Sequence, residues 1–267
     1  MLCHRLIARL DVKGANVVKG IHMEGLRVMG KPAEFATRYA EDGADELLFI
    51  DTVASLYGRN QLSGLLSETC EHVFVPITVG GGITSVEEAR RLFNSGADKI
   101  AINTGAIKRP VLIRELAGIY GSQAVAVSIQ AKRTPQGYEA YTDCGREKSG
   151  RDAIAWAHEA VALGAGEILI TSIDRDGTRK GFDIELCKAL APLPVPVVAC
   201  GGMGTVYHLK EVFDTGLTAA AFASVLHYGK FSMEEIKDVL RKDGYPIRAV
   251  EGKFHAEGTS AARSGAA

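Results

Sequence analysis

Short apolar, β-rich segments alternate along the chain with segments of helical periodicity, and this alternation limits the possible folds more than any other feature. Uniformly apolar strands are covered on both faces, and strict alternation with helices implies parallel pairing. Eight such units predict a single (β/α)8 TIM barrel of the α/β class, with an open doubly wound sheet as the alternative. The segments are LIARLDV (6–12), ELLFIDTV (46–53), VFVPITVGG (73–81), KIAINTG (99–105), AVAVSIQAK (124–132), EILITSI (167–173), VPVVACGG (195–202) and AAAFASVL (219–226).

The two halves of the chain resemble each other at an offset of about 120 residues. Residues 44–55 (ADELLFIDTVAS) match residues 165–176 (AGEILITSIDRD), and residues 78–89 (TVGGGITSVEEA) match residues 198–209 (VACGGMGTVYHL). Self-similarity of this length suggests a duplicated half-barrel. The pseudo-twofold axis would place equivalent groups on opposite sides of the barrel, which suits a ligand with two similar ends.

The length of 267 residues and the 46% hydrophobic content allow one large core, so residues 1–250 are predicted to form one barrel domain. Residues 133–150 read as a hairpin-like insertion in the fifth loop that overhangs the active rim. Residues 251–267 lack periodic apolar positions and are rich in Gly, Ala and Ser, so we expect a disordered tail.

Charge and composition favour a cytoplasmic protein that binds small molecules. The net charge of -1 offers no general attraction for nucleic acid or an anionic membrane, and no apolar run approaches the 18 residues of a membrane span. The start of the chain is not typical of a signal peptide. The cysteines and histidines are scattered without metal-ligand spacing, so we expect no metal site and no cofactor.

Glycines and small polar residues follow the strands in two matching places, which we call the first and second cradle. Glycine lets backbone amides approach an oxyanion, and Asn, Thr or Ser can add side-chain donors, so each cradle is predicted to bind a phosphate. The alternative is that the glycines only permit tight turns. The first cradle is Gly81, Gly82, Asn103 and Thr104, and the second is Gly201, Gly202, Ala223 and Ser224.

The sixth strand ends in a polar segment that we assign to the same substrate site as the second cradle. It contributes Thr171, Asp176, Gly177 and Thr178, and Thr178 is a candidate phosphate donor. The alternative for this segment is a solvated turn.

Asp11 ends the first strand, where a parallel barrel presents its reactive side chains, and is our candidate general acid or base. The duplication places Gln130 at the matching end of the fifth strand, and an amide can hydrogen-bond but cannot shuttle a proton. Asp51 ends the second strand, where holding loop amides is the favoured role. Lys19, in the first loop, is a candidate to close over the ligand, with an ordinary exposed lysine as the alternative.

Four charged residues start otherwise apolar strands and should meet at the opposite rim, as a set that we call the bottom ring. Two cations and two anions there predict an ion-pair network on the stability face of the barrel. The bottom ring is Arg5, Glu46, Lys99 and Glu167.

Six motifs together resemble one known family. They are LDVK (10–13), VVKG (17–20), TVGGGI (78–83), GADKIAIN (96–103), GAGEILITSIDRDGT (164–178) and ACGG (199–202). Over roughly residues 1–250 the chain resembles HisF, the cyclase subunit of imidazole glycerol phosphate synthase, in the HisA/HisF family.

The resemblance implies a reaction in histidine biosynthesis. Ammonia would close an imidazole ring from a phosphoribulosyl-formimino carboxamide ribonucleotide, yielding imidazole glycerol phosphate and an aminoimidazole carboxamide ribonucleotide. The two phosphates of the substrate would occupy the two cradles, Asp11 would act as general acid or base, and Lys19 would be a loop contact. A glutaminase (HisH-like) partner would dock at the N-terminal face, and the bottom ring matches the family's ammonia gate.

Gln130 departs from the family pattern, because the second catalytic aspartate belongs at that position. Losing a general acid or base typically costs about 10²–10⁴-fold in rate. One alternative is a HisF-like paralogue that works with a glutaminase-like partner in amidination of surface-polysaccharide sugars. Another is a catalytically silent phosphate-binding subunit. The sister isomerase of the same pathway uses two carboxylates and no ammonia gate, so Gln130 and the bottom ring both disfavour it.

Overall fold

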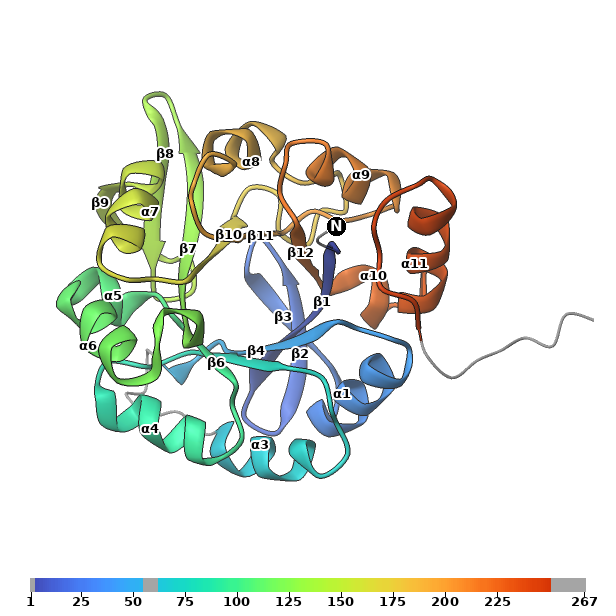
Figure 1. The fold of residues 1–267 in the computed structure, drawn as a ribbon, viewed down its shortest axis with the longest axis horizontal. Helices are drawn as coiled ribbons and strands as arrows, with labels where there is room; N and C mark the ends of the chain where they lie inside the picture. The colour runs from blue at the N-terminus through green and yellow to red at the C-terminus, as the bar shows by residue number, and fades with distance from the viewer. Residues whose placement is uncertain (1–2, 55–61, 251–267) are drawn as a thin grey trace, which may run out of the picture.

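Eight parallel strands close into a barrel in a computed structural model that describes residues 3–54 and 62–250 (Figure 1). Each strand pairs with the next in chain order, and the last pairs with the first. This confirms the predicted TIM barrel. The barrel strands are β1 (Arg5–Lys13), β4 (Glu46–Asp51), β5 (Ile77–Gly80), β6 (Lys99–Ile102), β7 (Val125–Thr134), β10 (Glu167–Ser172), β11 (Val197–Cys200) and β12 (Ala219–Phe222).

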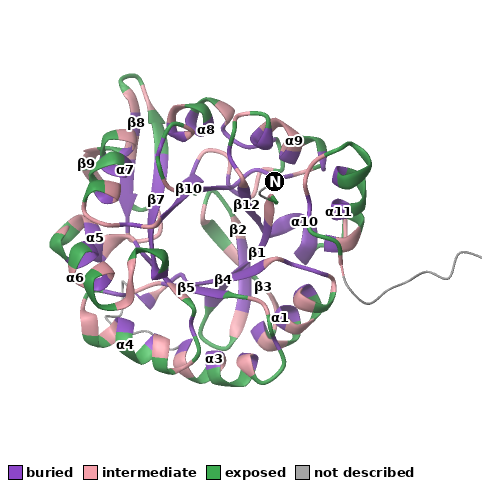
Figure 2. Ribbon diagram, in the orientation of Figure 1, coloured by how far each residue is buried: buried purple, intermediate pink, exposed green. Residues whose placement is uncertain are grey.

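Helices surround the barrel and turn their buried sides toward it, while their exposed sides form the outer surface (Figure 2). No helix among the described residues is long and apolar enough to cross a membrane. The described helices are α1 (Pro32–Glu41), α3 (Leu62–Cys70), α4 (Val86–Asn94), α5 (Thr104–Lys108), α6 (Val111–Tyr120), α7 (Ala153–Ala162), α8 (Ile184–Leu190), α9 (Tyr207–Phe213), α10 (Ser224–His227) and α11 (Met233–Lys242), with a 3₁₀ turn at Ser122–Ala124.

The two faces of each barrel strand bury different side chains, because successive residues of a strand point to opposite sides. In β1, Leu6, Ala8 and Leu10 belong to the core between barrel and helices, whereas Ile7 belongs to the smaller apolar cluster inside the barrel. By the same alternation, Arg9 and Asp11 point inward. Strand β1 therefore carries charged groups into the barrel on both sides of Ile7: Arg5 before it, and Arg9 and Asp11 after it.

Two antiparallel insertions interrupt the alternation of strands and helices. The first loop, which carries Lys19 and was not predicted to contain strands, forms a hairpin of β2 (Asn16–Ile21) and β3 (Glu24–Gly30). The predicted fifth-loop hairpin is present: β7 pairs with β8 (Gly137–Thr142), which pairs with β9 (Glu147–Asp152). The first barrel strand of each half is thus followed by an insertion, in agreement with the duplication. The predicted tail, 251–267, lies outside the described residues.

Candidate active site at the mouth of the barrel

Four buried charged side chains meet at the mouth, which is the end of the barrel where the strands finish. Arg9 Nε donates to Asp11 Oδ1 at 2.8 Å, and Lys19 Nζ lies 3.6 Å from Asp11 Oδ2. Lys19 also donates to both carboxylate oxygens of Asp176, each at 3.0 Å. Lys19 is therefore buried at the mouth, against the alternative of an ordinary exposed lysine.

The neighbouring cations determine the charge of Asp11. Burial alone would raise the pKa of Asp11, but the charges of Arg9 and Lys19 outweigh it and hold the pKa below its usual value. Burial likewise opposes the charge of Lys19, whose pKa is nevertheless raised, chiefly by Asp176 and Asp11. Asp11 is thus a carboxylate at neutral pH, which has no proton to donate and whose oxygens are acceptors.

Gln130 lies in β7, near the end of the stretch that pairs with β10, and is in register with Thr171 of β10. The side chain is 5% exposed, and its Oε1 has no hydrogen-bond partner among the described residues. An unpartnered buried acceptor costs roughly 1–3 kcal/mol, which a hydrogen-bond donor on a ligand would offset. Gln130 therefore offers hydrogen bonding at the mouth and no proton transfer.

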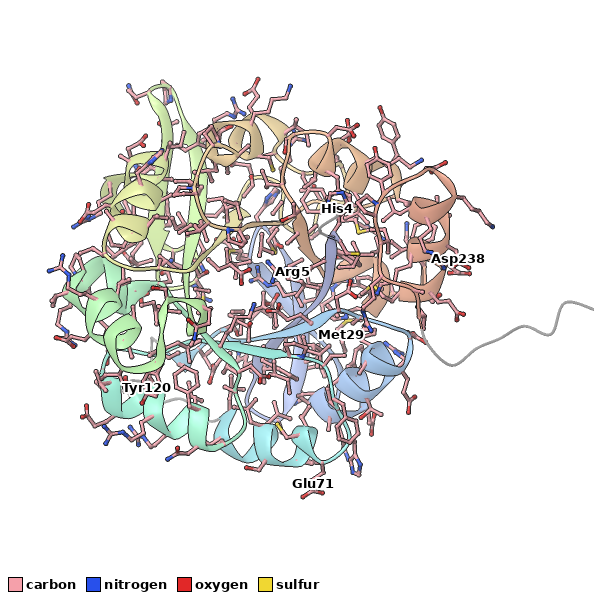
Figure 3. All side chains as sticks on the ribbon, viewed as in Figure 1. His4, Arg5, Met29, Glu71, Tyr120 and Asp238 are labelled. Carbon is pink, nitrogen blue, oxygen red and sulfur yellow. The ribbon has the colours of Figure 1, made fainter. Side chains whose placement is uncertain are left out.

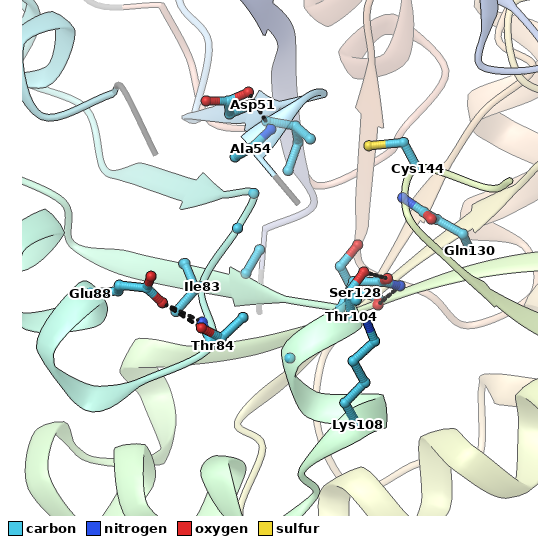
Figure 4. A pocket seen from close by; sticks show the side chains of 16 residues that line it. Asp51, Ala54, Ile83, Thr84, Glu88, Thr104, Lys108, Ser128, Gln130 and Cys144 are labelled. Atoms are coloured by element: carbon cyan, nitrogen blue, oxygen red, sulfur yellow. Dashed lines mark hydrogen bonds between the residues drawn. The ribbon is translucent and has the colours of Figure 1, made fainter. Parts of the chain in front are cut away.

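The first cradle lines a cavity of about 130 Å³ that Gln130 also lines (Figure 4). Asn103, predicted to offer its side-chain amide to a phosphate, instead donates it to the backbone oxygens of Ser128 and Tyr141 at 2.8 and 3.1 Å. The Thr104 hydroxyl donates to Asn103 Oδ1 at 3.2 Å. Asn103 in this conformation holds the surrounding loops, because its N–H groups already have acceptors.

The cradle glycines are also required by the backbone. Gly81 has a φ of 111°, and a Cβ there would lie 2.4 Å from the backbone oxygen of Asp51. Gly202 has the same φ, and a Cβ there would lie 2.1 Å from the oxygen of Gly181. Close backbone packing thus accounts for glycine at these positions independently of any ligand.

The second cradle and Gly177 line a cavity of about 20 Å³ together with Arg9 and Lys19. Thr178 was predicted as a phosphate donor here, but it lies in a neighbouring groove and its hydroxyl donates to the oxygen of Arg175 at 2.8 Å. Thr171 Oγ1 accepts from Arg9 Nη1 at 3.1 Å. Asp176 and Gly177 of the predicted loop both line the cavity, and the carboxylate of Asp176 accepts hydrogen bonds from Lys19.

Asp51 has the structural role that the sequence favoured. Its Oδ1 accepts hydrogen bonds from the backbone N–H groups of Val53 and Ala54 at 3.0 and 2.9 Å. The carboxylate thereby holds the loop that follows β4.

The bottom ring forms a closed cycle of ion pairs at the other end of the barrel. Arg5 contacts Glu46 at 3.0 Å and also pairs with Glu167, and Lys99 contacts the same two carboxylates at 2.8 and 3.0 Å. Figure 3 shows Arg5 near the centre of the barrel. The apolar cluster inside the barrel, which includes Ile7, separates this ring from the mouth.

Comparison with known proteins identifies the family. The family described as "Histidine biosynthesis protein" matches residues 5–232. An imidazole glycerol phosphate synthase subunit HisF from Legionella pneumophila is 58% identical over 202 residues, which are 75% of this chain and 95% of that protein. Proteins of the same name from Thermococcus onnurineus and Pyrococcus furiosus are 47% and 48% identical over 249 residues, 93% of this chain and 99% of each relative. The chain belongs to the HisF family.

One mouth residue of this HisF family member, Arg9, was not singled out from its sequence, whereas His227 was placed just beyond the last barrel strand with a structural role favoured. Arg9 is 3% exposed, and its signal was a charge on the inward face of an apolar strand, two residues before Asp11. His227 is buried, and its Nδ1 lies 2.6 Å from the hydroxyl of Tyr39. Burial lowers the pKa of His227 to about 4, so the ring is neutral at neutral pH.

Proposed function

We propose that this chain is the cyclase subunit of imidazole glycerol phosphate synthase in histidine biosynthesis. In this proposal, ammonia from a glutaminase partner converts the phosphoribulosyl-formimino carboxamide ribonucleotide to imidazole glycerol phosphate and the aminoimidazole carboxamide ribonucleotide in the cytoplasm. The observation that carries it is the axial arrangement of a HisF-family barrel: a carboxylate, Asp11, at the mouth, an apolar interior and a charged ring below.

Asp11 is the general base of the proposed reaction. Its negative charge, maintained by Arg9 and Lys19, lets it accept a proton from the substrate or from ammonia as the new C–N bond forms. The two cradles lie on opposite halves of the mouth, which suits a substrate with a phosphate at each end. Gln130 would hold the substrate by its amide.

The N-terminal face is the proposed docking surface of the glutaminase. Phe74, in the connection that leads into β5 at this face, is 90% exposed, and an exposed aromatic side chain is a frequent anchor of protein interfaces. Ammonia would enter through the bottom ring and travel through the barrel, where Ala101, Ala126 and Ala221 leave little side chain inside.

A second candidate function is favoured by the proton chemistry of the mouth. Asp11 is an ionised carboxylate and Gln130 is neutral, so neither supplies a proton at neutral pH. A paralogue that passes ammonia to another acceptor, as in amidination of surface-polysaccharide sugars, would not need the second acid. The other candidate is a phosphate-binding subunit without turnover.

The deciding experiment measures turnover of the phosphoribulosyl-formimino substrate with saturating ammonium salt, which removes the need for the partner. Native protein is compared with Asp11→Asn and Gln130→Asp. Native activity that Asp11→Asn abolishes supports the cyclase. Activity that appears only in Gln130→Asp points to the paralogue, and tight binding without turnover in native protein and in Gln130→Asp points to the silent subunit.

A further inference from the structure

Arg9 is a buried cation inside the barrel, and such a charge needs compensation. Moving a charged group out of water costs several kcal/mol unless it is paired and hydrogen-bonded. Asp11 supplies one partner, but Lys19 shares that carboxylate and Asp176 is taken up by Lys19. The four side chains carry two charges of each sign, so the cluster as a whole is neutral.

The hydrogen bonds of Arg9 leave part of its guanidinium free. Nε donates to Asp11, and Nη1 donates to the hydroxyl of Thr171 and to the thiol of Cys200, each at 3.1 Å. Sulfur is a weak acceptor. The Nη2 amino group has no hydrogen-bond acceptor among the described residues, so two N–H donors remain available to a ligand.

Arg9 lines the same cavity as the second cradle. That cavity also receives the side chain of Lys19, so two cations and one carboxylate, Asp176, face the Gly201–Gly202 turn. The first-cradle cavity is lined instead by Lys108 with two carboxylates, Asp51 and Glu88. The two ends of the mouth therefore differ in charge, and the second is the more positive.

The cavity beside Arg9 has room for about one water molecule in this conformation. It continues outward into a groove of about 580 Å³, and Lys19, Gly177 and Ser224 line both. A phosphate that entered from this groove would compete with Asp176 for Lys19 Nζ, which lines both spaces. Arg9 then forms the inner wall of the occupied site.

We propose that Arg9 is a phosphate-binding residue of the second cradle, whose free amino group donates to the phosphate that the cradle holds. Arginine presents paired N–H groups that match phosphate oxygens, and bonds between charged groups are roughly twice as strong as neutral ones. Because Nε of the same guanidinium holds Asp11, the bound phosphate and the base are fixed relative to each other. The inference rests on the phosphate recognition of the proposed function.

The first test is a titration of the ¹⁵N-labelled full chain with inorganic phosphate, followed by NMR. The amides of Gly82 and Thr104 report the first cradle, those of Gly202 and Ser224 report the second, and the Nε–H signal reports Arg9 directly. We expect the Arg9 signal to move with the same Kd as Gly202 and Ser224. An Arg9 signal that stays still while the second cradle saturates overturns the inference.

Variants separate a binding role from a structural one. Arg9→Met is expected to weaken phosphate binding at the second cradle by about tenfold or more, without changing the first. Arg9→Lys keeps the charge and should recover part of the loss. Arg90→Met removes an exposed charge from α4 and should change neither site.

The outcomes distinguish this inference from the proposed function. Equal affinity in native protein and Arg9→Met overturns the role of Arg9 and leaves the cradles in place. Phosphate that moves neither pair of cradle amides contradicts both. Thermal melts identify an Arg9→Met protein that does not fold, and in that case the native titration and Arg9→Lys decide.

Discussion

Asp11 lies 2.8 Å from Arg9 and 3.6 Å from Lys19, so Asp11→Asn leaves two buried cations with one carboxylate between them. Removing one partner of a buried pair typically costs about 3–5 kcal/mol. We expect Asp11→Asn to lower the free energy of unfolding at pH 7 by a large part of this amount, measured by urea denaturation. Arg9→Met/Asp11→Asn should lose less than the sum of the single changes. An Asp11→Asn protein as stable as the native one would contradict the pairing.

The same contact makes stability depend on pH in the acid range. The folded-state pKa of Asp11 is lowered, so its stabilisation is complete above the unfolded value near 3.9 and is lost as pH falls through the lower folded value. The loss thus occurs well below neutral pH.

The buried His227 predicts a second loss of stability, at higher pH than the loss caused by Asp11. Burial lowers the pKa of His227 to about 4 from an ordinary 6.5. Between these two pH values the unfolded chain binds a proton at His227 more readily than the folded chain does. The free energy of unfolding therefore falls as the pH drops from 6.5 to 4. Between pH 7 and pH 5 we expect His227 to account for a loss of about 2 kcal/mol. Urea denaturation at both pH values should show a smaller loss in His227→Gln. Equal losses of stability in the native protein and in His227→Gln would show that His227 is not a buried, neutral imidazole.

Helices α4 and α11 each begin with a capping box that can be tested as a unit. Ser232 accepts from the N–H of Glu235, whose carboxylate accepts from the N–H of Ser232, and Ser85 and Glu88 make the same exchange. Ser232→Ala should cost about 1 kcal/mol and lower the Tm by about 2–4 °C. Ser67→Ala is the matched control, because Ser67 is an exposed serine within α3 that does not cap the helix. A Ser232→Ala melt that coincides with the native one would show that the cap adds nothing.

Substitutions at the two rims of the barrel should separate binding of the partner from turnover. Phe74→Ser removes an exposed aromatic ring from the N-terminal face and is expected to weaken glutaminase binding by about 30-fold or more, while ammonium-dependent turnover stays unchanged. Val28→Ser removes an exposed apolar side chain from the hairpin at the opposite rim and should not change partner binding. Calorimetry with the glutaminase measures both. A stronger effect of Val28→Ser would place the partner at the mouth.

Local patterns in the sequence were enough to predict the barrel. The alternation of apolar strands and helices is repeated along the chain, and it permits few closed arrangements. The same holds for the bottom ring, since charges at the starts of parallel strands share one rim. The hairpin β2–β3 was missed because its glycines and polar residues give a weak strand pattern. The sequence does not show that Thr178 lines a neighbouring groove, because adjacency along a loop does not determine which cavity a side chain faces.

Strand ends identify Asp11, Gln130 and the cradle glycines as mouth residues from the chain alone, because the end of a parallel strand has a fixed place in a barrel. The charge of Asp11 depends instead on Arg9 and Lys19, and the placement of Lys19 depends on a hairpin that folds back over Asp176. The contact between Lys19 and Asp176 joins residues 157 positions apart. The energies of these contacts come from burial and distance, which only the folded chain sets.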